Sequence, residues 1–277
     1  MLRSILVALD DTPGAAAARD HAIALARRTG ASLTAAVVLD QPHTRPEHEF
    51  VPAGGGAFKA RRDAALAARM AADAAAALGA CAAAAGDLPF ERLELPDAPE
   101  PALLKAGATH DLIVIGRDST LGMEANEDGV APVIRNLLKE GARPLLVVPP
   151  EPHAGHGPVL VGYDGSLPCQ AALQLFALLG LAEGSAVVVA SAAETRAAAE
   201  ALAGEGATFL RRHGIAATAL PLEGDRPADL LLAEAEGLDA RLMVLGAYEE
   251  SSFLRLLTGS ATNRLLARSR GPVFIHR

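Results

Sequence analysis

The feature that most constrains the fold of this chain is a glycine spacing that occurs twice. In the first half, thirteen positions lead from Gly116 to Gly129, and in the second half thirteen positions lead from Gly246 to Gly259. Each leading glycine ends a short apolar run with the composition of a strand buried on both faces. A spacing repeated at such a distance indicates that one structural unit is written twice in the chain.

Other markers recur in the same order. Asp10 and Asp164 each end the first apolar run of their half and precede a hydroxyl residue two positions on, which suits a helix N-cap. Pro144 and Pro272 each begin the last apolar run of their half. The markers therefore predict two copies of a β-α-β-α-β-α-β-α-β unit.

Alternating strands and helices imply parallel sheets with helices on both faces. We predict an α/β fold of two tandem, doubly wound, five-stranded parallel-sheet domains, packed as a pseudo-dimer through their last strands. The domains are placed at residues 1–150 and 157–277, and Pro149–Pro158, PPEPHAGHGP, is a linker by composition. Extra residues in the first copy fall mostly in 41–58. The cluster Glu47, His48 and Glu49 in this segment could suggest a metal site, but no second matched pair lies nearby, so we expect a solvated loop.

Composition narrows the class of protein. The formal net charge of −8 and pI of about 5.5 argue against a nucleic-acid or anionic-membrane partner. No apolar run reaches the length of a membrane span, and the first residues suit a strand better than a signal peptide. Cys81 and Cys169 lack metal-ligand spacing. We expect a cytoplasmic protein with no resident metal.

The second half has the layout of a phosphate site. In such sheets, ligands lie beyond the carboxyl ends of the strands where strand order reverses, and Asp164 and Gly246 end the first and fourth strands there. Gly259 and Ser260 then open a helix, whose first amides and dipole favour an anion. Two alternatives stay open: an ordinary strand-to-helix connection, and Asp164 as a turn or capping residue.

These residues resemble the universal stress protein family, over nearly the whole chain and in two tandem copies. The family's first strand ends in Asp-Gly-Ser, as Val161–Ser166, VGYDGS, does here. Its nucleotide motif is Gly, two residues, Gly, nine residues, Gly, then Ser or Thr, and Gly246, Gly259 and Ser260 match three of these positions. Gly271–Val273 matches the family's small-Pro-Val entry to its last strand.

The match departs from the motif at one position of the second half. Glu249 stands where the motif has its second glycine, and a carboxylate there would repel phosphates. Arg255, Arg264 or a Mg²⁺ ion are the candidates to compensate. The first half departs further, because Ser119 and Val130 replace motif residues, so its nucleotide site is expected to be degenerate.

The resemblance implies a fold like that of the adenine nucleotide alpha hydrolases and a site for ATP, with or without Mg²⁺, in the second domain. It implies that Asp164 contacts the adenosine part and that Ser191 lies near the base. It further implies that ribose and phosphates are contacted by Gly246, Gly259, Ser260 and Ala261.

We weigh three functions. The first is a nucleotide-binding, ATP-binding regulatory protein of the stress response that is not an enzyme, because no catalytic motif is present. The second is a nucleotide-free interaction protein that acts on an unidentified protein partner, as an internal pseudo-dimer or as a homodimer. The third, an adenylyl-transferring enzyme, lacks a second motif to hold the pyrophosphate.

Overall fold

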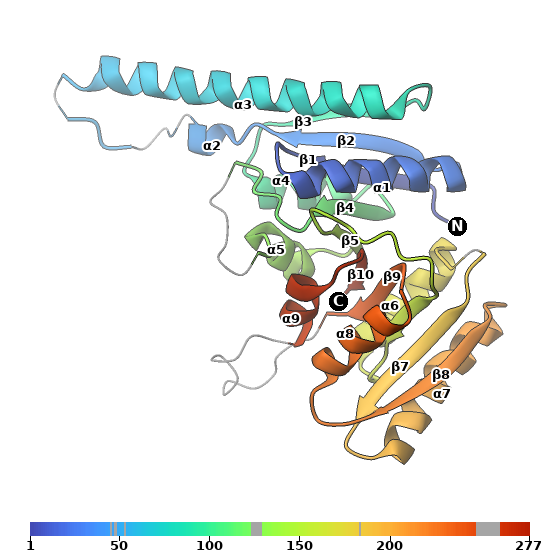
Figure 1. Ribbon diagram of the computed structural model, residues 1–277. Coiled ribbons are helices and arrows are strands. Elements are labelled where there is room, and N and C mark those ends of the chain that lie inside the picture. The colour runs from blue at the N-terminus through green and yellow to red at the C-terminus, as the bar shows by residue number, and fades with distance from the viewer. Residues whose placement is uncertain (45, 47–48, 53, 123–128, 183, 248–260) are drawn as a thin grey trace.

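The computed structural model describes residues 1–44, 46, 49–52, 54–122, 129–182, 184–247 and 261–277. Both halves alternate strands and helices, as predicted (Figure 1). The first half contains β1 (Ser4–Leu9), α1 (Pro13–Thr29), β2 (Ser32–Val38), α2 (Gln41–Thr44), α3 (Gly56–Ala85), β3 (Glu91–Leu95), α4 (Pro99–Gly107), β4 (Leu112–Gly116), α5 (Pro132–Glu140) and β5 (Leu145–Val148). The second half contains β6 (Val159–Gly162), α6 (Leu167–Leu179), β7 (Val187–Ala193), α7 (Arg196–Arg212), β8 (Ala217–Glu223), α8 (Pro227–Gly237), β9 (Leu242–Gly246), α9 (Ala261–Arg268) and β10 (Val273–His276).

The strands form one continuous sheet in the order β3-β2-β1-β4-β5-β10-β9-β6-β7-β8. Read from each outer edge inward, the two halves have the same strand order. Every pairing within a half is parallel, whereas β5 and β10 pair antiparallel at the centre. The α/β fold with two similar units is therefore confirmed, and the last strands join the units.

Local sequence explains where the first helix of each half begins and ends. The Thr12 hydroxyl accepts a hydrogen bond from the Ala15 amide at 3.2 Å, and Gly30 ends α1 in a left-handed conformation with φ of 69°. The Ser166 hydroxyl accepts from the Cys169 amide at 3.4 Å in α6. These helices therefore start at the residues that the capping pattern predicts.

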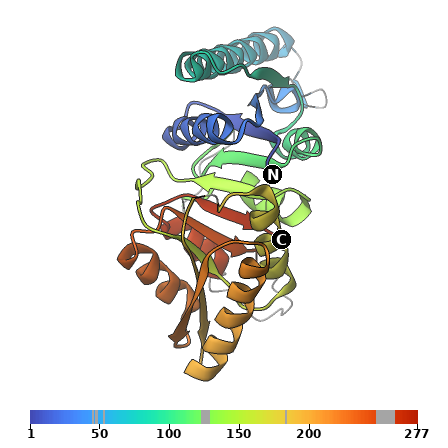
Figure 2. The same cartoon turned by 90° about the vertical axis from the view of Figure 1, so that its right-hand side faces the viewer.

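Two layers of helices cover the sheet (Figure 2). Buried side chains of α1, α3, α6 and α7 form one apolar core with one face of the sheet. Buried side chains of α4, α5, α8 and α9 form a second core on the other face. Because both faces are covered, the inner strands read as continuous apolar runs in the sequence.

The segment 41–58 differs from the predicted loop. It contains α2, and α3 begins at Gly56, inside the segment predicted as loop, and continues for 30 residues. Glu49 pairs with Arg62 and with Lys59 on α3. Glu47 and His48 lie outside the described residues.

α3 also corrects one expectation from composition. By length and composition alone it is a helix that could span a membrane, although the sequence was expected to hold no such stretch. Its apolar character comes mostly from alanine, and only 17% of its apolar window is buried. Ala74, Leu78, Cys81 and Ala85 form the stripe that packs into the first-half core.

The junction between the halves is apolar at its centre and polar at its ends. Phe274 on β10 is fully buried and pairs with Leu146 of β5 across the junction, and within its own half it packs edge-on against Phe176 of α6, with ring centroids 6.2 Å apart. Arg117, just after β4, donates to the carbonyls of Leu266 and Ser269 at 3.2 and 2.7 Å, at the end of α9. Reciprocally, Arg277 donates to the Lys139 carbonyl near the end of α5.

We predict that Arg117→Met destabilises the whole chain, because it leaves carbonyls at the end of α9 without their charged donor. The loss in free energy of unfolding is expected to be about 1–3 kcal/mol, measured by urea denaturation. Arg61→Met, on the exposed side of α3, is the matched control and is expected to change little. Equal effects of the two substitutions would contradict a bridging role for Arg117.

Candidate functional site

The second-half crevice lies where β6 and β9 run side by side. Val161 pairs with Val244, so both strands reach their carboxyl ends at the same level. The chain continues from β6 to β7 on one side, while β9 lies on the other, so strand order reverses here. This is the place where doubly wound sheets bind ligands.

Asp164 lies two residues after the end of β6 and is exposed. One oxygen of its carboxylate, Oδ1, accepts a hydrogen bond from the Ser166 amide at 2.9 Å. The residue therefore shapes the turn into α6, as one of the open alternatives proposed.

Gly246 ends β9 and is packed tightly against the start of α6. A Cβ atom there would lie 2.4 Å from the Cys169 amide nitrogen and 2.6 Å from the Pro168 carbonyl carbon. At Gly116 a Cβ would lie 2.4 Å from backbone of Gly14, at the start of α1. Each half thus needs a glycine here for the helix to approach the strand, independently of any ligand.

Ser191 lies in β7, level with the end of β6, and is 1% exposed. Its hydroxyl donates to the Tyr163 carbonyl at 2.6 Å, which fixes the strand end that precedes Asp164. The Tyr163 hydroxyl donates to Glu205 of α7 at 2.6 Å, and burial together with that carboxylate raises the Tyr163 pKa. Ser191 therefore holds the chain between β6 and Asp164 in place.

The remaining predicted site residues divide into two groups. Ala261 is the first residue of α9 and is half-buried. Arg264, a candidate to compensate Glu249, faces Asp229 of α8 at 3.4 Å. Outside the described residues lie Glu249, Arg255, Gly259 and Ser260, so the site as a whole stays a prediction.

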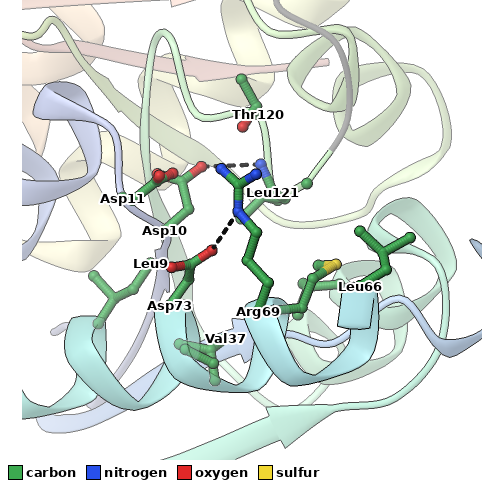
Figure 3. Close-up of a pocket in the computed structure, with 13 residues that line it drawn as sticks. Leu9, Asp10, Asp11, Val37, Leu66, Arg69, Asp73, Thr120 and Leu121 are labelled. Carbon is green, nitrogen blue, oxygen red and sulfur yellow. Dashed lines mark hydrogen bonds and ion pairs between the residues drawn. The ribbon is translucent and has the colours of Figure 1, made fainter. Parts of the chain in front are cut away.

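The first-half crevice contains a cavity of about 310 Å³ (Figure 3). Its wall comes from the ends of β1 and β2 and from the loop after β4, and α3 covers it through Leu66, Arg69 and Met70. The Asp10 carboxylate is fully engaged there. Oδ1 accepts from the Thr12 amide and hydroxyl at 2.9 and 2.6 Å, and Oδ2 accepts from the Leu121 amide at 2.9 Å.

Charge in this cavity disfavours a phosphate. Its lining carries the carboxylates of Asp10, Asp11 and Asp73 and the guanidinium of Arg69, which already pairs with Asp73 at 3.7 Å. The lining therefore has an excess of negative charge, and a phosphate would be repelled.

The loop after β4 is buried where the family motif has its second glycine. Ser119 is fully buried, and within the described chain its hydroxyl has no hydrogen-bond partner. Its neighbour Asp118 also has a buried, unpartnered carboxylate oxygen, and burial raises the Asp118 pKa. The side chains of Asp118 and Ser119 therefore occupy the space beside this loop.

Sequence reasoning missed the part of α3 that covers the first cavity. Arg69, Met70 and Asp73 carry no motif, and α3, which is 30 residues long, brings them to the crevice. The matching helix of the second half, α7, has 17 residues. The one available signal was this difference in helix length between the copies.

Across the described ranges, no group of three or more His, Cys, Asp or Glu side chains is arranged to hold a metal.

The fold defines a tandem, doubly wound α/β protein whose two crevices differ. The family model for the universal stress protein family matches residues 1–149 and again residues 156–277. The chain belongs to the universal stress protein family, in a form with two family units. No curated protein matches the chain significantly.

Two solved structures that cover nearly the whole chain support the same fold. A universal stress protein from Archaeoglobus fulgidus DSM 4304 has a TM-score of 0.69 at 16% identity, covering 99% of this chain and 96% of that chain. A functionally unknown protein from Pseudomonas aeruginosa PAO1 has a TM-score of 0.60 at 17% identity, covering 99% and 92%. A universal stress protein from Archaeoglobus fulgidus in complex with dAMP matches 44% of this chain at a TM-score of 0.37 and 20% identity, covering 98% of that chain.

We predict that Gly116→Ala and Gly246→Ala each destabilise the protein without any nucleotide, by about 1–3 kcal/mol, because the new methyl group overlaps helix backbone. Gly79→Ala and Gly204→Ala are matched controls inside α3 and α7, where a Cβ meets nothing within 4 Å. Those controls are expected to stabilise by about 0.5–1 kcal/mol. Thermal unfolding measures all four, and a stable Gly246→Ala protein would contradict the packing role.

Proposed function

We propose that this protein is a stress-response regulator that binds an adenine nucleotide, ATP with or without Mg²⁺, in its second half. The observation that carries the proposal is the contrast between the two equivalent aspartates. Asp164 is exposed at its strand end, whereas both oxygens of Asp10 are occupied by protein donors. The proposed contacts are Asp164, Gly246, Gly259, Ser260 and Ala261, and the buried Ser191 would lie near the base and hold the strand end before Asp164.

The helix beside the second crevice supports this choice of half. The buried stripe of α3, Ala74, Leu78, Cys81 and Ala85, matches that of α7, Ala199, Ala203, Gly206 and Leu210. This match places Ala198 of α7 where α3 has Asp73, and it places Glu194, which precedes α7, where α3 has Arg69. At the position of Asp73 the second crevice therefore has a small side chain without charge, which leaves more room for a base and ribose.

The phosphate end of the proposed site is α9. Its described part begins at Ala261, and the dipole of a helix gives its amino end partial positive charge, which favours an anion at that end. Such a site binds and orients a nucleotide, which suits a protein that reports nucleotide level to a partner through its bound state.

The role of Asp164 is tested by titrating ATP with and without Mg²⁺ in a calorimeter. We predict that Asp164→Ala weakens binding about tenfold or more, since a hydrogen bond to a charged group contributes about 1.5–3 kcal/mol. Asp10→Ala is the matched control in the first half, and its ATP affinity is expected to stay unchanged. Circular dichroism verifies that both variants fold. Unchanged affinity in Asp164→Ala would reject the placement.

A nucleotide-free interaction protein is the second candidate, and Glu249 favours it because a carboxylate at the motif's second glycine repels phosphates. No ATP binding by the unmodified protein at millimolar concentration would leave this candidate alone. The acidic cavity of the first half shows that one copy of the unit already carries a lining unsuited to phosphate.

Glu249→Gly separates the two candidates further. We predict tighter ATP binding, by up to a few kcal/mol where the repulsion is poorly solvated, because a negative charge near the phosphates is removed. Glu250→Gly, at the next position, is the control for a general change in loop charge and backbone freedom. Weaker or equal affinity in Glu249→Gly would mean that the carboxylate points away from the phosphates or helps to hold a metal.

A further inference from the structure

A second cavity, of about 250 Å³, lies at the junction of the two halves and away from the proposed nucleotide crevice. It is lined by Leu112 and Leu242, the first residues of β4 and β9, so it lies toward the amino ends of these strands. The first half contributes side chains of α1, the linker contributes His153, and the second half contributes Arg241.

The charge of this cavity has one sign. The ionisable side chains among its lining residues are His21, Arg28, His153 and Arg241, and the lining includes no aspartate or glutamate. His153 is held by Asp239 at 2.5 Å, and His21 Nδ1 contacts the Ala17 carbonyl at 3.0 Å. The two arginines therefore dominate the charge of the cavity.

Arg241 is the most unusual residue of this group. Its Nε and Nη2 atoms are buried and have no hydrogen-bond partner anywhere in the described chain. A buried charged donor without a partner costs free energy, so native proteins normally supply an acceptor. Burial lowers the Arg241 pKa, and the neighbouring charge of Arg28 lowers it further.

Arg28 adds a second uncompensated charge from the other half of the chain. It lies in the last turn of α1 and is exposed. Its neighbour Arg27 donates to the Ala85 carbonyl at 2.7 Å and faces Asp87 at 3.8 Å. No such ion pair is found for Arg28 or Arg241 among the residues with described positions. Two guanidinium groups that repel each other beside an acid-free cavity create a strong positive potential there.

We propose that this cavity binds a small oxyanion, a phosphate or carboxylate group, between Arg28 of the first half and Arg241 of the second. Planar oxyanions and phosphates match the fork of a guanidinium donor, which the exposed Arg28 presents, and the volume suits a small ion. An anion held there touches both halves and the linker, so its binding stabilises their mutual packing. The inference does not rest on the proposed nucleotide site.

The test is thermal unfolding of the full chain in sodium phosphate and in sodium chloride of equal ionic strength. Phosphate stabilises proteins generally by exclusion from their surface, so the variants carry the argument. Arg61→Met, an exposed arginine on α3, is expected to gain as much from phosphate as the unmodified protein does. Arg241→Met is expected to lose the specific part of that gain, because a site-bound ion stabilises only the state that binds it.

Two further results are expected. Without phosphate, Arg241→Met is at least as stable as the unmodified protein, because a buried charge without a partner has been removed. In calorimetric titrations with inorganic phosphate, Arg28→Gln raises the dissociation constant at least tenfold, and this variant of an exposed side chain keeps the test usable where Arg241→Met fails to fold. Replacing phosphate by acetate shows which oxyanion the site prefers. Equal phosphate gains in Arg241→Met and Arg61→Met, or unchanged phosphate affinity in Arg28→Gln, would overturn the proposal.

Discussion

The antiparallel pairing of β5 with β10 is the interaction on which the rest of the structure depends. It turns two sheets of like order into one, and it removes from solvent an edge that each half would otherwise expose. Phe274 sits fully buried on this seam, and Arg117 and Arg277 each reach the end of the other half's last helix. The halves are therefore held by backbone, apolar and charged contacts at once.

Duplication has kept the scaffold and changed the crevices. Gly116 and Gly246 remain in both copies because each lets a helix approach its strand, a demand of packing that a ligand does not alter. The crevice residues carry no such demand. In the first copy a long α3 and the Leu121 amide occupy the neighbourhood of Asp10, whereas the second copy leaves Asp164 exposed. The two copies thus differ at the aspartate that follows their first strand.

Much of the fold could be predicted because local signals and the repeat agreed. Thr12 and Gly30 mark the ends of α1, and the strand β1 matches its apolar run. Helix α2 was missed because its four residues, with Pro42 among them, carry no apolar period. Tertiary packing places α3 over the first crevice and leaves the buried Arg241 without a hydrogen-bond partner. No residue spacing in the sequence predicts either feature.

The central claim is that the second crevice, and not the first, accepts a nucleotide. Hydrogen exchange read by mass spectrometry, with and without saturating ATP, tests it most directly, since bound ligand slows exchange of the amides it orders. The account predicts added protection at residues 163–166, 246–247 and the first turn of α9, with residues 10–12 and 116–122 unchanged. Protection confined to residues 10–12 and 116–122, or none in either half, would contradict it.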